Sequence, residues 1–127
     1  MINGIKIEKF TGYFKIFRWK FRYYTIVNSI FYYSVNEDFE LKDAKGCAFL
    51  GICKIVENET TNNKLTLYTG SKNWYFRGNE LEIFNLKNAI QKGISEAKIL
   101  NLNETKIIIS DNTDEEEMSF MDSNTND

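Results

Sequence analysis

The sequence contains no histidine and no proline, and it has only two cysteines among its 127 residues. Without histidine, the commonest general base of enzymes is missing. Cys47 and Cys53 alone are too few to hold a zinc ion or to staple a secreted scaffold, so we interpret them as buried free thiols and expect no metal and no other cofactor. A Gly-rich phosphate loop and a nucleophile-elbow serine are absent too. These absences predict a protein that is not an enzyme.

Long apolar runs are also absent. No stretch approaches the roughly 18 to 20 apolar residues that a membrane-spanning helix needs, so we expect no transmembrane segment. Residues 1–6 lack the apolar stretch of a secretion signal, and Ile2 stands where myristoylation requires glycine. We therefore expect a cytoplasmic protein whose membrane contact, if it has one, comes from its folded surface.

Large apolar side chains, by contrast, are plentiful, and charge is unevenly distributed. Hydrophobic residues make up 43% of the chain, including ten Phe, seven Tyr and two Trp, which is enough for one packed core. The net charge is -2. Residues 1–103 contain 15 basic and 10 acidic residues, whereas residues 104–127 contain one basic and eight acidic residues. We predict one domain over 1–103 and an acidic, disordered tail over 104–127.

Between Ile5 and Phe76 the chain is a series of short aromatic and β-branched runs separated by Asn, Gly, Asp and Lys, which is typical of antiparallel strands. We predict seven strands, at residues 5–16, 21–27, 30–34, 46–52, 54–58, 64–69 and 73–76. Gly12 is expected to allow a bend or a bulge in the first of them. Residues 106–110 either add a further strand or pack against the body.

One helix is predicted after the strands. Asn79 is followed three residues later by Glu82, the pattern of a capping box. Apolar residues then recur at the helical spacing of three or four: Ile83, Leu86, Ile90, Ile94 and Ala97. The predicted fold is mainly β with one α-helix, a seven-stranded antiparallel barrel or sandwich capped by a C-terminal amphipathic helix.

Positive charge is concentrated at the start of the chain. The first 22 residues contain a single acid, Glu8, and six cations, Lys6, Lys9, Lys15, Arg18, Lys20 and Arg22. Because side chains alternate along a strand, Lys20 and Arg22 share one face. A short turn through residues 17–18 is expected to bring Lys15 to the same open, water-facing rim. Three cations at one rim form a suitable site for a phosphate group, because Lys and Arg donate charge-assisted hydrogen bonds to its oxygens.

The aromatic residues of this hairpin have two interpretations. Trp19, Phe21 and Tyr23 project to the face opposite Lys20, and we predict that they serve core and cross-strand packing. Phe17, at the expected turn tip, either enters the headgroup zone of a membrane or is a buried turn residue.

The stretch GYFKIFRWKFRYYTI at 12–26, followed by IFYY at 30–33, resembles the opening of pleckstrin-homology (PH) domains. Lys45-Gly46 ahead of a hydrophobic strand and Asn88-Ala89-Ile90 in the helix are similar to the family as well, and the likeness covers roughly residues 4–98. The Asn-rich, Pro-free composition is similar to that of small stand-alone PH-like proteins of apicomplexan-type protists.

The resemblance implies phosphoinositide binding, because Lys15, Lys20 and Arg22 match the basic positions of the family's pattern. Tyr33 stands where some members use a hydroxyl to reach a headgroup phosphate, and Arg18 lies between the matched positions. The loop between the first two strands is short, which implies weak or broad binding of acidic lipids, including phosphatidic acid. Leu86 stands where the family usually has Trp.

Two functions follow as hypotheses. The first is a lipid-binding module peripheral to the cytosolic face of a membrane, and the alternative is a protein-interaction adaptor that uses a sheet edge or the helix flank of the same fold. Nucleic acid is not expected as a partner, because the net charge is negative and the aromatics are assigned to packing. The acidic tail is either a solvating extension or a segment that competes with lipid for the basic hairpin.

Overall fold

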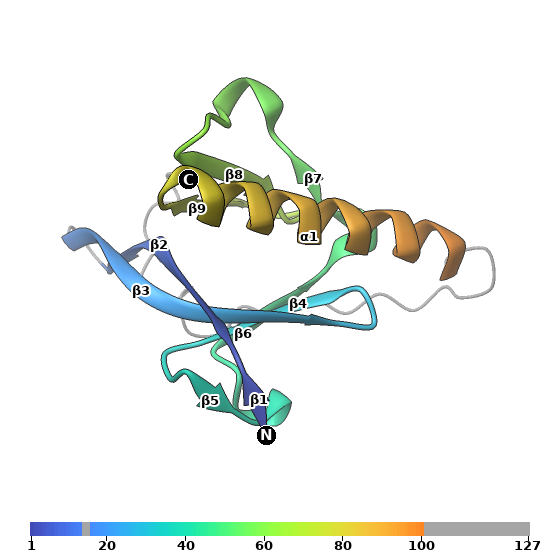
Figure 1. Ribbon diagram of the computed structural model, residues 1–127, viewed down its shortest axis with the longest axis horizontal. Coiled ribbons are helices and arrows are strands. Elements are labelled where there is room, and N and C mark those ends of the chain that lie inside the picture. The colour runs from blue at the N-terminus through green and yellow to red at the C-terminus, as the bar shows by residue number, and fades with distance from the viewer. Residues whose placement is uncertain (14–15, 101–127) are drawn as a thin grey trace.

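The computed structural model describes residues 1–13 and 16–100 (Figure 1). Its strands are β1 (Ile2–Asn3), β2 (Ile5–Tyr13), β3 (Ile16–Val27), β4 (Ile30–Ser34), β5 (Asp38–Phe39), β6 (Gly46–Phe49), β7 (Lys54–Ile55), β8 (Lys64–Tyr68) and β9 (Asn73–Arg77). Its helices are α1 (Glu80–Leu100) and the short 3₁₀ turns η1 (Leu41–Asp43), η2 (Leu50–Ile52) and η3 (Glu57–Glu59).

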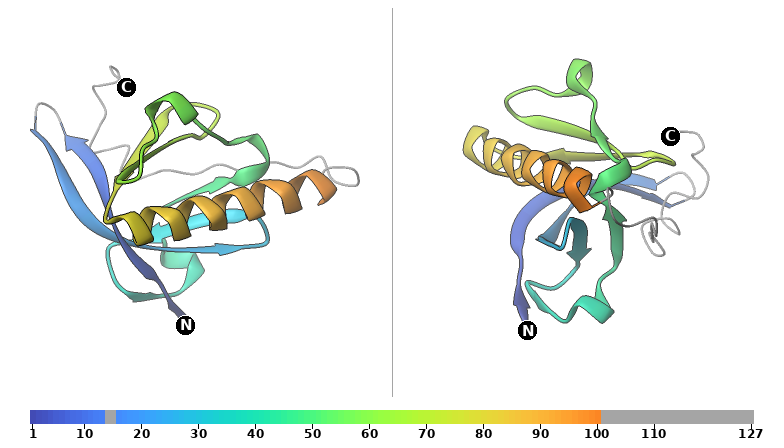
Figure 2. Two further views of the ribbon diagram at one scale, coloured as in Figure 1. Left: turned by 45° about the horizontal axis from the view of Figure 1, so that its top comes forward. Right: turned by 90° about the vertical axis from the view of Figure 1, so that its right-hand side faces the viewer.

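Seven of the strands form one antiparallel sheet in the order β6-β4-β3-β2-β9-β8-β7, while β1 and β5 form a separate two-stranded sheet. β2 joins the two halves of the large sheet. It pairs with β3 along its whole length but with β9 only at Glu8 and Lys9. The halves therefore fold over each other, and α1 runs along one side between them (Figure 2). The predicted β-sandwich with one C-terminal helix is confirmed.

The core lies between the two halves, where every second residue of a strand points inward. The side chains that meet there from three strands are less than 2% exposed: Phe31, Tyr33, Leu65, Leu67, Trp74 and Phe76. The Phe31 ring lies 6.0 Å from that of Trp74 and 5.7 Å from that of Phe76, between ring centroids. These ring contacts hold β4 and β9 together across the core.

The helix begins as predicted. The backbone N–H of Glu82 donates to Asn79 Oδ1 at 2.8 Å, and the backbone N–H of Asn79 donates to Glu82 Oε1 at 2.9 Å. These reciprocal bonds satisfy two donors at the helix start. The predicted apolar face is confirmed as well, because Ile83, Leu86, Ile90 and Ala97 are buried and Ile94 is half-buried.

The first hairpin differs from the prediction in two ways. Its turn is not at residues 17–18, because Tyr13 already pairs with Ile16 and β3 begins there. The β2–β3 register is unbroken from Ile5 to Tyr13, so no bulge lies at Gly12. A Cβ atom at Gly12 would collide with the ring of Phe17, so glycine makes room for that ring instead.

Two of the other observed strands are clearly shorter than predicted. The strand predicted at 46–52 ends at Phe49 and continues as η2, and the strand predicted at 54–58 keeps only Lys54–Ile55 before η3. The small β1–β5 sheet was not predicted, since two-residue strands leave no periodic pattern.

Some predictions lie outside the described residues, namely Lys15, a strand at 106–110 and the acidic tail at 104–127. Over the described ranges, 1–13 and 16–100, no helix combines the length and the apolar character that crossing a bilayer requires. The same ranges contain no cluster of three or more His, Cys, Asp or Glu residues suited to a metal ion.

Candidate functional site

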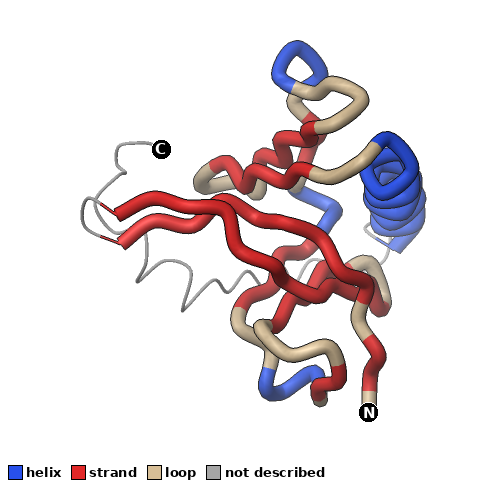
Figure 3. Tube along the Cα trace, turned by 60° about the vertical axis from the view of Figure 1, so that its left-hand side comes forward, coloured by secondary structure: helices blue, strands red, loops and turns tan. Residues whose placement is uncertain are grey.

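The candidate site is the β2–β3 hairpin, whose ends project beyond the rest of the sheet (Figure 3). Its register opposes Arg22 to Ile7, Lys20 to Lys9 and Arg18 to Thr11 on one face of the hairpin. We call Lys9, Arg18, Lys20 and Arg22 the cationic face. The alternating positions on the opposite face form the aromatic strip, which consists of Phe10, Phe17, Trp19 and Phe21.

Lys9 is the most deeply placed member of the cationic face, with no exposed surface. Its ammonium group lies 4.7 Å from the ring centroid of Tyr33 and 5.0 Å from that of Trp74. The two rings are themselves in edge-to-face contact, with centroids 5.2 Å apart. Because aromatic faces attract cations, this pair of rings holds a positive group at the border of the core.

Tyr33, which the resemblance places at a headgroup phosphate, is also fully buried. A Cβ atom at Gly46 would collide with the Tyr33 ring and hydroxyl, so glycine is needed beside it. In this structure Tyr33 contacts the buried Lys9 and contributes no exposed surface to the cationic face.

Arg22 differs from its predicted position. The sequence predicts it at a water-facing rim, whereas the structure leaves it only 4% exposed, with Nη1 donating to the Phe21 carbonyl oxygen at 3.0 Å. The reason is its place along β3, opposite the buried Ile7, close to the body of the sheet. Arg18 and Lys20 lie nearer the end of the hairpin and are exposed. The cationic face is therefore accessible near the hairpin end and buried toward the core.

Lys9 and Lys20 oppose each other directly across the two strands. Residues in such a pair have Cβ atoms about 5 Å apart, and like charges at that position repel each other. An anion bound beside the pair offsets this repulsion, because it attracts both ammonium groups. Sequence reasoning counted Lys9 among the basic residues but did not single it out. The available signal was that Lys9 shares one face of its strand with Ile7 and Thr11.

The aromatic strip lies outside the core. Phe21 is 52% exposed and Phe17 is 43% exposed, while Phe10 and Trp19 are half-buried. The prediction of a core role for Trp19 and Phe21 is therefore wrong, although their cross-strand packing is confirmed. The Phe10 ring lies parallel to that of Phe17 at 5.8 Å and edge-on to that of Trp19 at 5.3 Å, between centroids.

Cations border the aromatic strip. Lys6 Nζ lies 4.2 Å from the ring centroid of Phe21, and the Arg77 guanidinium carbon lies 4.5 Å from that of Trp19. Arg77 also donates to both carboxylate oxygens of Glu8, at 3.0 and 3.4 Å. The negative charge of Glu8 is thus compensated by a neighbouring guanidinium.

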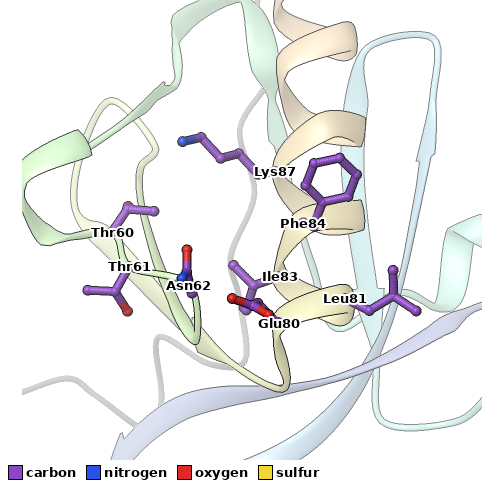
Figure 4. Close-up of a pocket in the computed structure, with 8 residues that line it drawn as sticks. All are labelled: Thr60, Thr61, Asn62, Glu80, Leu81, Ile83, Phe84 and Lys87. Atoms are coloured by element: carbon purple, nitrogen blue, oxygen red, sulfur yellow. The ribbon is translucent and has the colours of Figure 1, made fainter.

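A separate groove lies between the first turns of α1 and residues 60–62, with a cavity volume of about 530 Å³. Leu81 and Phe84 line it and are 67% and 61% exposed. Figure 4 shows their side chains on the side of α1 away from Thr60 and Asn62. The groove is a second apolar surface, distant in sequence from the hairpin.

Cys47 and Cys53 do not form a disulfide. Cys53 is buried as predicted, but Cys47 is only half-buried. Burial raises the pKa of the Cys53 thiol from its ordinary value of 9.0 to about 12. Since the thiolate is the reactive form, Cys53 is inert at neutral pH.

We expect stability to fall as the pH rises from about 9 to about 12. Because the folded pKa of Cys53 lies above its unfolded value, its contribution is complete below pH 9 and is lost as the pH rises toward 12. The loss amounts to at most about 1.4 kcal/mol per pH unit. Burial and the nearby Glu82 raise the pKa of Tyr24 from 10.0 to about 12, so Tyr24 adds the same trend above pH 10.

Urea unfolding at a series of pH values measures this loss of stability. Cys53→Ala should flatten the decline below pH 10, and an equally steep decline in that variant would contradict the assignment.

No protein-family model matches the chain, and no curated protein is similar to it at a significant level.

Proposed function

We propose that this protein is a non-enzymatic, PH-like membrane-recruitment module that binds the headgroups of acidic phospholipids at the cationic face. One observation carries the proposal, the convergence of four cations on one face of two paired strands, with Lys9 directly opposite Lys20. An anionic phosphate is attracted to all four groups, and each basic group near an anionic leaflet contributes about 1 kcal/mol.

The four cations have different roles in this proposal. Arg18 and Lys20 are exposed and contact the phosphate oxygens directly, and the Arg18 guanidinium offers two parallel donors. Lys9 and Arg22 are buried behind them and contribute positive potential from a region of low dielectric constant. The headgroup is therefore bound at the end of the hairpin rather than inside the sandwich.

The predicted PH resemblance supports this proposal through the order of its elements, seven antiparallel strands followed by one helix. Only residues 14 and 15 separate the paired Tyr13 and Ile16, so the connection between the first two long strands is short. A short connection offers few additional donors around a headgroup. We therefore expect recognition of acidic phospholipids as a class, phosphatidic acid included, with little preference for one phosphoinositide.

The alternative is a protein-interaction adaptor with little lipid binding. The groove beside Leu81 and Phe84 favours it, because exposed apolar residues beside a hollow suit the apolar face of a partner. This surface is independent of the cationic face, so the two functions are separable by mutation.

A panel of vesicles tests the proposal. Phosphatidylcholine vesicles that contain one acidic lipid at a time are sedimented with the protein at low and at physiological salt. We expect binding to all acidic vesicles and none to phosphatidylcholine alone. Binding at physiological salt should remain strongest for headgroups with a doubly charged phosphate, because direct charge-assisted contacts are screened less than diffuse attraction.

Two outcomes would overturn the proposal. If no acidic vesicle binds at either salt concentration, the cationic face is not a lipid site. If binding vanishes completely at physiological salt for every lipid, the attraction is diffuse and no headgroup is held.

A further inference from the structure

The aromatic strip is a contiguous apolar surface that the core does not use. Two of its rings, Phe17 and Phe21, expose 43% and 52% of their surface, although aromatic side chains gain most when they are removed from water. Contiguous exposed apolar patches on a folded protein mark a binding surface more often than scattered single residues do. We therefore expect the strip to be a binding surface.

The contacts within the strip restrict the kind of ligand that it can bind. One face of the Phe21 ring is covered by Lys6, Trp19 is covered by Arg77, and Phe10 lies parallel to Phe17. Nucleic-acid bases bind aromatic residues by stacking on ring faces. Because one face of each of these rings already carries a cation or another ring, less ring face is left for stacking bases, and the cations at the border favour an apolar environment next to anions.

The charges around the strip point to an anionic environment. β2 and β3 together contain a single acid, Glu8, and its carboxylate is held by Arg77 at 3.0 Å. The bordering Lys6 is exposed and positively charged. The surface of an acidic bilayer meets both requirements, since an apolar zone lies directly beneath a layer of negative phosphates.

We propose that the aromatic strip enters the boundary between the headgroups and the acyl chains of an acidic bilayer, while the cationic face of the same hairpin remains at the depth of the phosphates. The inference rests on the proposed function and deepens it, because it makes a lipid surface, and not a free inositol phosphate, the ligand. Side chains on the two faces of a strand point in opposite directions. They therefore differ in depth by roughly 10 Å, which matches the 5 to 10 Å by which amphipathic elements enter this boundary.

Tryptophan fluorescence reports the depth of the strip. The chain has two tryptophans, Trp19 in the strip and Trp74, which is 1% exposed in the core. Vesicles of phosphatidylcholine and phosphatidylserine with brominated acyl chains should quench the wild-type protein. The quenching should disappear in Trp19→Phe, in which only the core tryptophan remains. Unchanged fluorescence of the wild-type protein in saturating vesicles would overturn the inference.

A matched pair of double variants measures the contribution to affinity. Phe17→Ala with Phe21→Ala should weaken binding to these vesicles about tenfold or more, because two rings no longer leave water. Leu81→Ala with Phe84→Ala removes two apolar side chains of α1 that are even more exposed, and it should change binding less than twofold. Circular dichroism checks that both variants remain folded.

The outcomes separate this inference from the proposed function. If the Phe17 and Phe21 variant binds like the wild type while Arg18→Glu with Lys20→Glu does not bind, the headgroup site stands and the inserted strip is overturned. If the charge variant binds like the wild type, the proposed function itself fails. If single-stranded RNA without vesicles quenches Trp19, the strip is a stacking surface and the membrane inference is wrong.

Discussion

Replacing Arg18 and Lys20 together by glutamate should lower the affinity for acidic vesicles a hundredfold or more. The double variant changes the charge of the exposed end of the cationic face by four units, and each unit near an anionic leaflet is worth about 1 kcal/mol. The glutamate at position 20 would also lie opposite Lys9 across the strands, where its carboxylate would lower the positive potential that Lys9 contributes. Vesicle sedimentation at physiological salt measures the loss.

The choice of these two positions comes from the structure. Arg22 has the matching position in the family pattern, but it is 4% exposed, and a glutamate there would bury a charge and destabilise the fold. The matched control is Lys92→Glu with Lys98→Glu, which makes the same change of net charge at two exposed positions of α1. The control should lower binding less than fivefold. An equal loss in both variants would show that net charge, not the hairpin, determines binding.

Leu86→Ala should lower the free energy of unfolding by about 3 kcal/mol and the melting temperature by about 10 °C. Leu86 has no exposed surface and belongs to the main core cluster, together with Ile83 and Ile90 from the same helix. Truncation leaves a cavity where α1 packs on the sandwich, and neighbouring side chains fill such cavities only in part. Urea unfolding and calorimetry measure the two quantities.

Leu81→Ala is the matched control for this prediction. It removes the same atoms from the same helix at a position that is 67% exposed, so stability should change by less than about 0.5 kcal/mol. Equal effects of the two substitutions would contradict the packing of α1 against the core.

The fold was predictable where local signals agree with each other. β4 matches its prediction at both ends, because Asn28 and Ser29 adopt positive φ angles and form the short turn before it. The turn before Ile16 was misplaced, since residues 14–15 are Phe and Lys and carry no turn signal. The start of α1, by contrast, has a clear local signal in the sequence, because Asn79 and Glu82 form a capping box.

The site was predictable only in part. Alternation along β3 correctly separates Lys20 and Arg22 from Trp19 and Phe21, but it does not say which of the two faces is buried. Aromatic residues ordinarily mark the buried face, whereas here Lys9 and Arg22 are buried and Phe21 is exposed. Lys9 can lie inward because Tyr33 and Trp74 offer ring faces to its ammonium group. This stabilisation of a buried cation depends on contacts from distant strands, which cannot be predicted from the periodicity of one strand.

The pairing of β2 with β9 has a consequence for how the chain folds during its synthesis. β2 leaves the ribosome well before β9, yet Glu8 pairs with Arg77, far along the chain. Strands 2 to 4 can form a meander early, but the inward side chains Ile7, Phe31 and Tyr33 stay uncovered until β9 emerges. Closure of the sandwich is therefore a late, long-range step, and the nascent meander is the species that molecular chaperones would encounter.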